Sequence, residues 1–558
     1  MPPTRPARKR HGEHYTPPAL AAFLAGRGVL ALADDRGGPV RVLDPACGDG
    51  ELLLAAHRAL TRSGHATVEL TGFDLDDAAV DQARRRCAAA GIPATLHTGD
   101  FLNLVDELAP GGFDLVITNP PYVRTQVLGA STAAALARRF GLSGRVDLTH
   151  PFVSVLPRVL ADRGVLALLC SNRFLTTRSG RNVRDVLTRR MRISELYDLG
   201  DTKLFDAAVL PAIVIASTGG DPPQATQPAG GVRFVRAYEG HDGPAASSDL
   251  YAALAGSAST QVRLDGRTIM VTVGRLDTGD RTTEPWRCEH DANGSWHRAT
   301  TRNRWQTFGE VAKIRVGIKT TADAVFIRDD WSQLPARCRP EAELLLPLLT
   351  HRNVAAWHPP DPSPLRVLYP YDLCSARRRV LDLADYPGTR GYLRLHEQRL
   401  RSRRYVVDGG REWFEIWVPQ RPARWADPKI VFPDISERPR FSIDRSGAVV
   451  NGDCYWISVP DLPTEEIAYL MLGVANSSFG LRFYDAVCGN RLYAGRRRWM
   501  TQYVNLFPLP HPTAAVSQKI IQIARTLCGA TVLGPDAPLA ELDDLVERAF
   551  SAVPDPLG

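Results

Sequence analysis

The first 215 or so residues of the chain alternate short apolar runs with amphipathic stretches. Apolar runs predict β-strands at residues 40–44, 68–74, 113–118, 164–170 and 212–216. The spacing of apolar positions predicts a helix at residues 51–60, between the first and second runs, and another at 77–90, between the second and third. Strands that alternate with helices in this way predict an α/β fold, with a mostly parallel sheet covered by helices on both faces.

The pattern changes after residue 218. Residues 219–303 begin with a stretch rich in Gly, Pro, Gln and Thr and then show little periodicity, which predicts a linker and connector. Residues 304–512 hold short β-like runs, for example at 429–432 and 455–459, and most of the tryptophans, which predicts a second, mixed α/β domain. Residues 513–558 predict a helical tail.

Composition places the chain among globular proteins of more than one domain, with 558 residues, 44% hydrophobic and 23% charged. No apolar run reaches the roughly 18 residues of a membrane span, and the first residues lack the apolar core of a signal peptide, so we expect a cytoplasmic protein. The nine cysteines form no Cys-x-x-Cys pair, so neither a metal site nor a disulfide framework is expected. A net charge of +7 is compatible with a polyanionic partner, although many soluble proteins are mildly basic.

A glycine-containing turn follows the first predicted strand, at residues 44–50 (Asp-Pro-Ala-Cys-Gly-Asp-Gly). In an open parallel sheet, ligands bind beyond the carboxyl ends of the strands, and Gly48 and Gly50 would let the backbone approach such a ligand closely. The third glycine of a pyrophosphate-binding loop is absent, and Asp44 suits a cationic ligand better than a phosphate. S-adenosylmethionine, with its amine and sulfonium, is therefore the candidate cofactor. A turn without any ligand remains open on this motif alone.

Two further acidic positions narrow the interpretation. Asp74 ends the second predicted strand, where a carboxylate can accept both hydroxyls of a ribose. Asp100 and Phe101 follow a third strand-like run and offer an acceptor for an adenine amino group and a ring for its face. Each acid alone is typical of a solvated surface, but three acids at the ends of three successive strands form a much more specific pattern.

The most specific feature is the run Asn-Pro-Pro-Tyr at residues 119–122, which directly follows the predicted strand at 113–118. An exocyclic amine on a heteroaromatic ring is a poor nucleophile because its lone pair is delocalised. The side-chain carbonyl of Asn119 and the backbone carbonyl of Pro120 can accept the amine hydrogens and favour a tetrahedral nitrogen, and Tyr122 can stack on the ring. An ordinary turn is the alternative, and the glycine turn upstream makes it the weaker one.

The order of these motifs resembles the γ class of amino-methyltransferases, most closely the TaqI-type N6-adenine DNA methyltransferases of restriction–modification systems. The resemblance implies a Rossmann-like, class I S-adenosylmethionine-dependent methyltransferase domain at residues 1–218 and a target-recognition domain at 304–512. Residues 119–122 match the catalytic motif of the family. Phe205 is similar to an aromatic residue that stacks on the opposite face of a flipped base, although a core position fits it equally well. The positions that match cofactor-binding motifs are Tyr15, Thr16, Asp44, Ala46, Gly48, Gly50, Asp74, Asp100, Phe101 and Asn119.

Arginines and aromatic residues concentrate in the second half of the chain. Residues 391–424 hold eight arginines against four acids, and a second arginine cluster lies at 491–498. Arginine can bind phosphate or read guanine, although for any single arginine a salt-bridged surface position is the better interpretation. Together the clusters predict contact with double-stranded DNA. The residues expected to make it are Arg399, Arg403, Arg404, Trp413, Arg496, Arg497 and Arg498.

The expected function is therefore methyl transfer to N6 of a flipped adenine at a specific DNA site, in bacterial restriction–modification or phage defence. The cell compartment would be the cytoplasm at the nucleoid, and a separate restriction endonuclease or other defence subunit is a candidate partner. Methylation of N4-cytosine in DNA, of adenine in RNA or of a protein glutamine amide remains open, as does a DNA-binding specificity subunit of a larger complex. The arginine-rich second half favours DNA, and the intact motifs favour an active enzyme.

Overall fold

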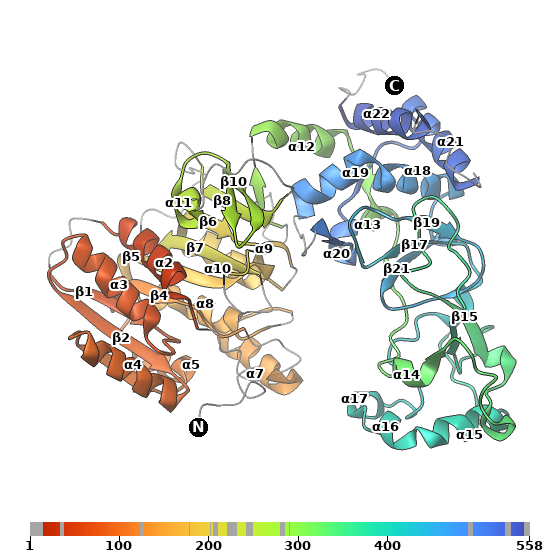
Figure 1. The fold of residues 1–558 in the computed structure, drawn as a ribbon, viewed down its shortest axis with the longest axis horizontal. Helices are drawn as coiled ribbons and strands as arrows, with labels where there is room; N and C mark the ends of the chain where they lie inside the picture. Colours follow the sequence, from red (N-terminus) through yellow and green to blue (C-terminus); the bar gives the residue numbers. More distant parts are fainter. Residues whose placement is uncertain are drawn as a thin grey trace. The chain divides into compact units, whose positions relative to one another are not determined.

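A computed structural model describes most of the chain and divides it into two compact units, residues 1–293 and 294–558 (Figure 1). Each unit is described by itself. None of the helices that the model describes is both long enough and apolar enough to cross a membrane. The described residues are 15–33, 38–122, 128–144, 146–177, 179–200, 202–204, 210–219, 231–240, 249–278, 285–289, 291–375, 377–488, 495–529 and 537–551.

The first unit is built on one sheet, coloured from red to yellow-green in Figure 1. Eleven strands of the described residues pair in the order β11-β10-β8-β6-β7-β5-β4-β1-β2-β3, with β9 joined to β10. The pairs among β1 to β5 and the pair β6–β8 are parallel, whereas β7 and β10 pair antiparallel to their neighbours. The strands are β1 (Val40–Asp44), β2 (Val68–Asp74), β3 (Ala94–Thr98), β4 (Phe113–Thr118), β5 (Leu160–Ser171), β6 (Arg192–Asp198), β7 (Pro211–Ser217), β8 (Arg233–Glu239), β9 (Thr260–Leu264), β10 (Arg267–Asp277) and β11 (Arg287–Glu289).

Helices cover both faces of this sheet, as the alternating sequence pattern predicts. Apolar side chains of α2, α3, α4 and α11 form one buried cluster with the sheet, and those of α5, α8, α9 and α10 form another on its opposite face. The mostly parallel α/β fold is thereby confirmed, and the predicted strands at 40–44, 68–74 and 113–118 coincide with β1, β2 and β4. The helices are α2 (Pro18–Leu30), α3 (Glu51–Arg62), α4 (Asp77–Ala89), α5 (Phe101–Leu104), α7 (Ala130–Phe140), α8 (Thr149–Val159), α9 (Arg173–Thr176), α10 (Arg181–Arg189) and α11 (Leu250–Ala255).

The strand order reverses at β1. From β1 the chain runs outward through β2 to β3, and it then returns to add β4 on the other side of β1. Because β1 and β4 pair in parallel, with Val42 opposite Leu115 and Leu43 opposite Val116, the loops that follow them leave the same edge of the sheet side by side. Such a reversal is the position at which open α/β sheets bind their ligands.

The expectation that residues 219–303 form a poorly patterned connector needs correction. Strand β8 pairs in parallel with β6, and β10 pairs with β8, so this segment continues the central sheet. Val235, Ile269 and Val271 are fully buried in the same apolar cluster as α2 and α3. Ile269, Val271 and Val273 recur at every second position, which is a period-two strand signal, but this signal lies beyond a turn-rich stretch that hid its link to the first domain.

The second unit contains two small four-stranded sheets, ordered β13-β21-β17-β19 and β14-β16-β15-β20, and two two-stranded pairs, β12–β23 and β18–β22. The runs predicted as strands at 429–432 and 455–459 form the central pair β17–β21 of the first sheet. The strands are β12 (Gln306–Thr307), β13 (Arg315–Val316), β14 (Ile327–Arg328), β15 (Leu345–Leu349), β16 (Arg366–Leu368), β17 (Lys429–Pro433), β18 (Ile435–Ser436), β19 (Ser442–Asp444), β20 (Val449–Val450), β21 (Cys454–Ser458), β22 (Arg497–Arg498) and β23 (Pro508–Leu509).

The C-terminal helices belong to the core of the second unit. Helices α18, α21 and α22 share one buried apolar cluster, and Ile520 of α21 lies against Gly473 of α18. The Trp296 indole N–H of α12 donates to a carboxylate oxygen of Glu547 in α22 at 2.7 Å. The helical tail expected at 513–558 therefore packs as an integral part of this unit. The helices are α12 (Asp291–Asn303), α13 (Phe308–Val311), α14 (Asp323–Phe326), α15 (Pro387–Leu395), α16 (Glu397–Arg401), α17 (Arg404–Val407), α18 (Glu465–Asn476), α19 (Ser478–Phe483), α20 (Thr501–Val504), α21 (Ala515–Gly529) and α22 (Ala537–Ser551).

Candidate functional site

The glycine turn after β1 requires its two glycines. Gly48 and Gly50 have φ angles of 52° and 81°, in the left-handed region that side chains with a Cβ disfavour. A Cβ on Gly50 would lie 3.0 Å from the Cβ of Ala83 in α4. A Cβ on Gly48 would lie 3.6 Å from the ring of Tyr15, so that ring faces the turn. Tyr15 is 41% exposed, which leaves part of its ring available to a ligand.

Asp44, at the end of β1, is a buried carboxyl group with incomplete hydrogen bonding. Its side chain is fully buried, and its Oδ1 accepts the backbone N–H of Ala46 at 3.1 Å. Its Oδ2 has no hydrogen-bond partner among the described residues. The pKa of Asp44 is raised to about 7, mainly by burial and in small part by the negative charge of Asp74, and the Ala46 amide and the nearby Thr118 hydroxyl partly offset this rise. A buried acceptor of this kind beside a glycine turn suits a ligand that brings a positively charged hydrogen-bond donor.

Asp74, at the end of the neighbouring strand β2, is held by backbone donors. Its Oδ2 accepts the N–H of Gly48 at 2.8 Å, and its Oδ1 accepts the N–H of Asp76 at 2.9 Å. Burial raises the pKa of this carboxyl group as well. Because each carboxylate oxygen can accept more than one hydrogen bond, Asp74 retains acceptor capacity toward the turn that contains Gly48.

The third predicted acid has a structural task in this conformation. Asp100 caps the short helix α5, since its Oδ1 accepts the N–H of Leu102 at 3.0 Å. Phe101 is only 2% exposed and packs between Phe73 and Phe152, at ring-centroid distances of 5.6 and 5.8 Å. Little of the Phe101 ring therefore remains to cover a ligand, which differs from the expectation that this ring presents its face to an adenine.

Ala46, Cys47 and Asp49 lie at the sides of the turn. Ala46 is half-buried and packs against the apolar cluster that contains Phe101. Cys47 is buried against Gly72 of β2, since a Cβ on that glycine would lie 3.0 Å from the Cys47 sulfur. Asp49 is bound by the Arg86 guanidinium at 2.7 Å. Cys47 and Asp49 therefore support the turn and leave its ligand-facing side to Asp44 and Gly48.

The loop after β4 brings the candidate catalytic residues to the same edge. The Asn119 side-chain amide donates through Nδ2 to the Thr16 hydroxyl at 3.2 Å, and its Oδ1 accepts the Tyr122 hydroxyl at 2.5 Å. These two bonds fix the orientation of the amide from both sides. Thr16 and Tyr15 are neighbours in sequence, so the Asn119 loop and the glycine turn are joined through the same N-terminal segment.

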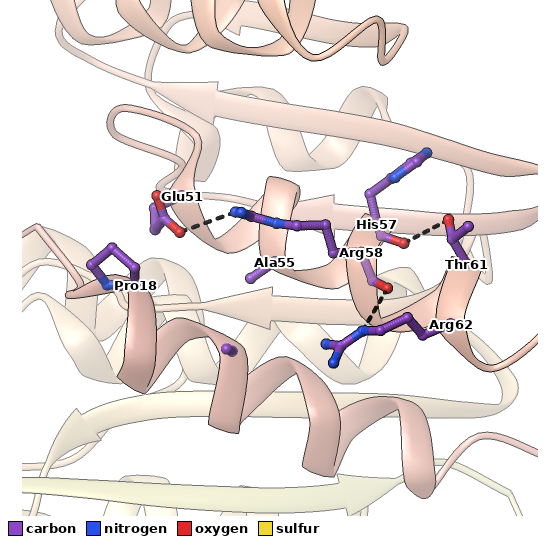
Figure 2. A pocket seen from close by; sticks show the side chains of 8 residues that line it. Pro18, Glu51, Ala55, His57, Arg58, Thr61 and Arg62 are labelled. Atoms are coloured by element: carbon purple, nitrogen blue, oxygen red, sulfur yellow. Dashed lines mark hydrogen bonds and ion pairs between the residues drawn. The ribbon is translucent and has the colours of Figure 1, made fainter.

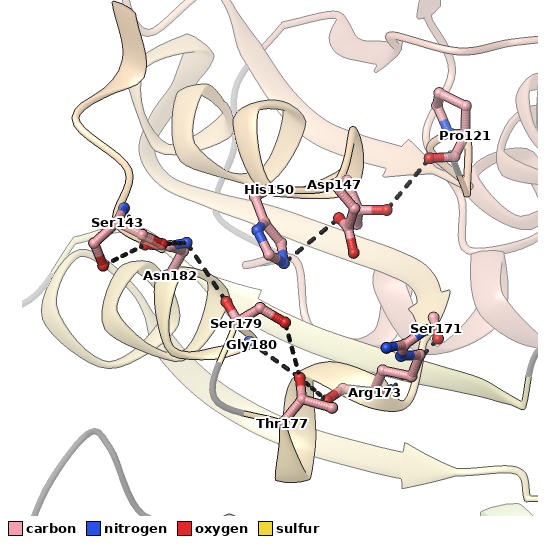
Figure 3. Close-up of polar contacts among 11 residues, drawn as sticks. Pro121, Ser143, Asp147, His150, Ser171, Arg173, Thr177, Ser179, Gly180 and Asn182 are labelled. Carbon is pink, nitrogen blue, oxygen red and sulfur yellow. Dashed lines mark hydrogen bonds and ion pairs between the residues drawn. The ribbon is translucent and has the colours of Figure 1, made fainter. Parts of the chain in front are cut away.

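A residue that carries no sequence signal supports this loop. The Thr149 hydroxyl, in the first turn of α8, donates to the backbone carbonyl of Pro121 at 3.3 Å. In the same turn, His150 Nε2 lies 3.5 Å from Asp147 Oδ1 (Figure 3), and burial lowers the pKa of His150. The helix terminus thus holds the loop from the side of α8. Sequence reasoning missed Thr149 because it lies 28 positions from its partner and belongs to no motif.

A surface groove beside α2 and α3 is distinct from these residues (Figure 2). None of the residues predicted to bind the cofactor lines it. Phe205, predicted to stack on a base, lies outside the described residues. The lining consists of Pro18, Ala22, Glu51, Ala55, His57, Arg58, Thr61 and Arg62.

The arginines predicted to contact DNA fall into two groups. Arg399 and Arg404, on α16 and α17, are exposed and have no hydrogen-bond or ion-pair partner for their guanidinium groups among the described residues. Arg496 is also exposed. Trp413 is half-buried, with the Arg401 guanidinium 5.3 Å from its ring centroid.

Arg403, Arg497 and Arg498 are committed to partners within the second unit. Arg403 is buried and donates to the carbonyls of Thr320 and Trp413 at 2.9 and 2.8 Å. Arg497 is also buried and binds the carboxylate of Asp485 through two bonds of 2.7 Å. Arg498 is exposed and lies 3.1 Å from Asp434. The prediction of DNA contact therefore needs correction for Arg403 and Arg497, since moving either guanidinium would leave buried acceptors unpaired. Sequence composition counts arginines and cannot separate those that are buried.

Several known proteins are similar to this chain in sequence, and solved structures are similar to it in fold. Residues 69–205 match the family model of the Eco57I restriction-modification methylase. The type II methyltransferase M.BanIII of Aneurinibacillus aneurinilyticus is 36% identical over 545 residues, which cover 93% of each chain. The chain belongs to the type II methyltransferases of restriction–modification systems.

Further relatives of this type II methyltransferase extend the likeness over both units. M.XhoI of Xanthomonas vasicola, another type II methyltransferase, is 26% identical over 84% of this chain and 86% of its own. The cryo-EM structure of a DrdV–DNA complex superposes with a TM-score of 0.51 at 11% identity and covers 94% of this chain and 58% of that one. At that identity the superposition shows a shared fold.

The titration of Asp44 yields a stability prediction. Burial raises its pKa from the ordinary 3.8 to about 7, so the folded protein retains a proton in this interval that the unfolded chain has released. The stabilising contribution is fully present below the ordinary pKa and is lost as the pH rises to about 7, by at most about 1.4 kcal/mol per pH unit. Asp44→Asn keeps an oxygen for the Ala46 amide and removes the titration.

Urea unfolding of both proteins at several pH values between about 5 and 8 measures this effect. We expect the free energy of unfolding of wild type, relative to Asp44→Asn, to fall toward pH 7 and then to become constant. A difference that does not change below pH 7 would show that Asp44 titrates in its ordinary range.

Proposed function

We propose that this type II methyltransferase transfers the methyl group of S-adenosylmethionine to the N6 amine of an adenine in double-stranded DNA. The observation that carries the proposal is the Asn119 amide, which Thr16 and Tyr122 hold in one orientation at the carboxyl end of β4. The glycine turn with the unpartnered Asp44 oxygen leaves the sheet beside it. This arrangement supports a site for an amine next to a site for a cationic cofactor, on adjacent parallel strands.

The residues around the glycine turn fit S-adenosylmethionine. For the ammonium group, Asp44 offers its buried Oδ2, which has no hydrogen-bond partner among the described residues. Asp74 retains acceptor capacity for the ribose hydroxyls. Tyr15 faces Gly48, which has no side chain to fill the space between them. The bound cofactor supplies a methyl group made electrophilic by the sulfonium. The ionised form of Asp44 is favoured once a positive charge lies beside it, because an opposite charge lowers the pKa of a carboxyl group.

At the site proposed for the amine that receives the methyl group, the groups that accept its hydrogen bonds are fixed before the substrate binds. Asn119 Oδ1 accepts the Tyr122 hydroxyl at 2.5 Å, and an amide oxygen with two lone pairs can also accept a hydrogen of the incoming amine. The Pro120 carbonyl is the second acceptor, and the proline ring restricts the backbone at that point. Two fixed acceptors favour the tetrahedral nitrogen that attacks the methyl group.

Tyr122 serves in its neutral form. Burial raises the pKa of its phenol well above the ordinary value, so it remains a hydrogen-bond donor to Asn119 at any working pH. Its half-buried ring packs against the apolar cluster of the sheet, which limits its motion while a base stacks on it. No phenolate is available as a base, in agreement with a reaction driven by orientation and by acceptor hydrogen bonds.

Asn119 also favours adenine over cytosine. Among the amino-methyltransferases that this chain resembles, the N4-cytosine enzymes more often have Ser or Asp as the first residue of the catalytic motif. The asparagine at this position therefore supports N6-adenine as the target. Chromosomal DNA in the bacterial cytoplasm is the proposed substrate, and a separate endonuclease is the proposed partner of the system.

The second unit presents a basic surface that suits the DNA backbone. Arg390, Arg394, Arg399 and Arg404 on α15, α16 and α17 are exposed, and their guanidinium groups have no ion-pair partner among the described residues. The same helices expose Tyr405 to 46%. Figure 1 shows the three helices close together in the second unit. Unpaired arginines on one surface bind phosphates without first breaking internal salt bridges.

Labelled S-adenosylmethionine incubated with plasmid DNA, followed by nucleoside analysis, tests the proposal. Label in N6-methyladenine is the expected result. Asn119→Ala removes one of the two acceptors, so we expect a loss of transfer of about 100-fold or more. The dissociation constant of the cofactor, measured by calorimetry, should stay close to that of wild type, because Asn119 acts mainly on the amine.

Three results would contradict this assignment. Label in N4-methylcytosine would exclude adenine as the target, and label only in RNA or protein would exclude DNA. Loss of cofactor binding in Asn119→Ala, with transfer reduced only as a consequence, would show that the loop belongs to the cofactor site alone.

The exposed arginines yield a second prediction. Replacing Arg399 and Arg404 by Ala should weaken DNA binding and reduce the slope of log affinity against log salt by about 0.9 for each phosphate that the variant no longer neutralises. Arg445→Ala combined with Arg525→Ala is the matched control, because it removes the same two charges from other exposed positions of the second unit, where Arg445 is bound to Glu465 and Arg525 lies 3.9 Å from Glu466. Binding to a duplex, measured by fluorescence anisotropy at several salt concentrations, gives both slopes. Equal slopes for the double variant and wild type would exclude this surface from binding phosphates.

A further inference from the structure

We propose that Tyr238 and Arg267, on strands β8 and β10, are positioning residues for the methyl-acceptor side of the active site. They act by fixing the end of β6 and the adjoining residue Thr202 at the carboxyl edge of the sheet. The proposal rests on the function proposed above and assigns a role to the segment that the sequence presented as a connector.

The centre of this arrangement is Asp198, the last residue of β6, which is 5% exposed. Its Oδ2 accepts the Tyr238 hydroxyl at 2.7 Å, and its Oδ1 accepts the Asn172 side-chain amide at 2.9 Å. The backbone N–H of Gly200 also donates to Oδ1 at 3.3 Å, and the Arg236 guanidinium lies 3.9 Å from Oδ2. A buried carboxylate with donors on both oxygens is held in a single orientation, and so is the backbone that continues from it.

Arg267 makes a second connection to the same segment. Its guanidinium donates to the backbone carbonyl of Thr202 at 3.0 Å and lies 3.6 Å from Glu239 of β8. Thr202 is 1% exposed, and its hydroxyl donates to the carbonyl of Leu199 at 2.7 Å. The turn after β6 is therefore bound both at Asp198 and at Thr202 by side chains of β8 and β10.

The start of β7 is fixed at the same place. The N–H of Asn172 donates to the carbonyl of Leu210 at 2.8 Å, and the N–H of Leu199 donates to the carbonyl of Pro211 at 3.0 Å. Asn172 therefore joins two structures at once, because its side chain binds Asp198 and its backbone binds Leu210. The described residues on both sides of positions 205–209 are thus held by one network.

This network lies at the edge of the sheet that carries Asn119. Strand β6 runs parallel to β5 and β4, because β7 pairs antiparallel with both β5 and β6. Asp198 ends β6 as Thr118 ends β4, and the two strands are three spacings of about 4.8 Å apart, on the order of 14 Å. The Asn119 loop and the Asp198 network therefore leave the same edge of the sheet, and we infer that they bound an extruded base from two sides.

Asp198 and its partners on β8 also share a face of the sheet with Tyr122, whereas Arg267 lies on the face of Ile269 and contacts Thr202 beyond the end of β6. Leu196 and Phe234 belong to the apolar cluster against which Tyr122 packs, whereas Tyr197 and Val235 belong to the cluster of the opposite face. Successive residues of a strand alternate between faces, so Asp198 lies on the face of Tyr122. In β8 the same alternation places Arg236 and Tyr238 there too.

Tyr238→Phe tests the proposal with little change in shape. Burial raises the pKa of the Tyr238 phenol well above its ordinary value, so the hydroxyl is a donor that the variant removes. Wild-type enzyme first maps the target adenine on DNA. Single-turnover methylation at saturating cofactor, and the fluorescence of 2-aminopurine placed at the mapped adenine, are then compared between wild type and variant.

We expect the rate for Tyr238→Phe to fall about 10- to 100-fold, the equivalent of one hydrogen bond to a charged group. The fluorescence increase that reports base extrusion should fall with it, and the dissociation constant of the cofactor should not change. Tyr197→Phe is the matched control. Tyr197 precedes Asp198 and donates to Glu195 at 2.8 Å, and its hydroxyl bonds among the described residues involve Glu195 and Arg233 and do not reach Asp198, so its loss should leave rate and fluorescence as in wild type.

Wild-type rate and fluorescence in Tyr238→Phe would overturn the inference, and so would equal losses in Tyr238→Phe and Tyr197→Phe. If Tyr238→Phe does not fold, Arg267→Gln removes the bond to Thr202 and is expected to show the same two losses, with wild-type values again overturning the inference. A wild-type enzyme that leaves no N6-methyladenine in DNA would instead refute the proposed function itself, before any variant is compared.

Discussion

Parallel pairing of β1 with β4 is the constraint on which the rest of the active site depends. The register of Val42 with Leu115 and of Leu43 with Val116 makes the two strands end together. The glycine turn and the Asn119 loop are thereby adjacent although they lie about 70 positions apart in sequence. Helices on both faces bury these strands, so the strand ends cannot shift without disturbing a packed core. In the proposed reaction, proximity of methyl donor and acceptor therefore comes from the sheet itself.

On the proposed cofactor side of the sheet edge, the carboxyl group of Asp44 has incomplete hydrogen bonding among the described residues. Asp44 is fully buried with one oxygen lacking a hydrogen-bond partner among the described residues, and its pKa is raised to about 7. Burial of such a group costs stability unless a positive charge lies beside it. The acceptor side differs, because Asn119 and Asp198 are already satisfied by neighbouring side chains. Binding a cation is therefore expected to complete the cofactor side, whereas the acceptor side is ready in advance.

Local patterns predicted much of this architecture, because apolar runs and turn residues act over short distances. The limits of β1, β2 and β4 and the presence of a second mixed domain follow from such patterns. Contacts between distant positions could not be predicted in the same way. Thr149 reaches Pro121 and Tyr238 reaches Asp198 only because the fold joins their strands and helices. Burial separates Arg403 from its exposed neighbour Arg404, although composition treats them alike.

The most direct test of the account is a crystal structure of the protein with a non-reactive analogue of S-adenosylmethionine. We expect the analogue at the carboxyl edge, with its amine within hydrogen-bond distance of Asp44 and its ribose hydroxyls at Asp74. Its adenosyl and amino-acid parts should leave the Asn119 loop open on the side of Tyr122. An analogue bound in the groove beside α3, or anywhere that leaves the Asp44 oxygen without a partner, would contradict the claim that adjacent parallel strands bring donor and acceptor together.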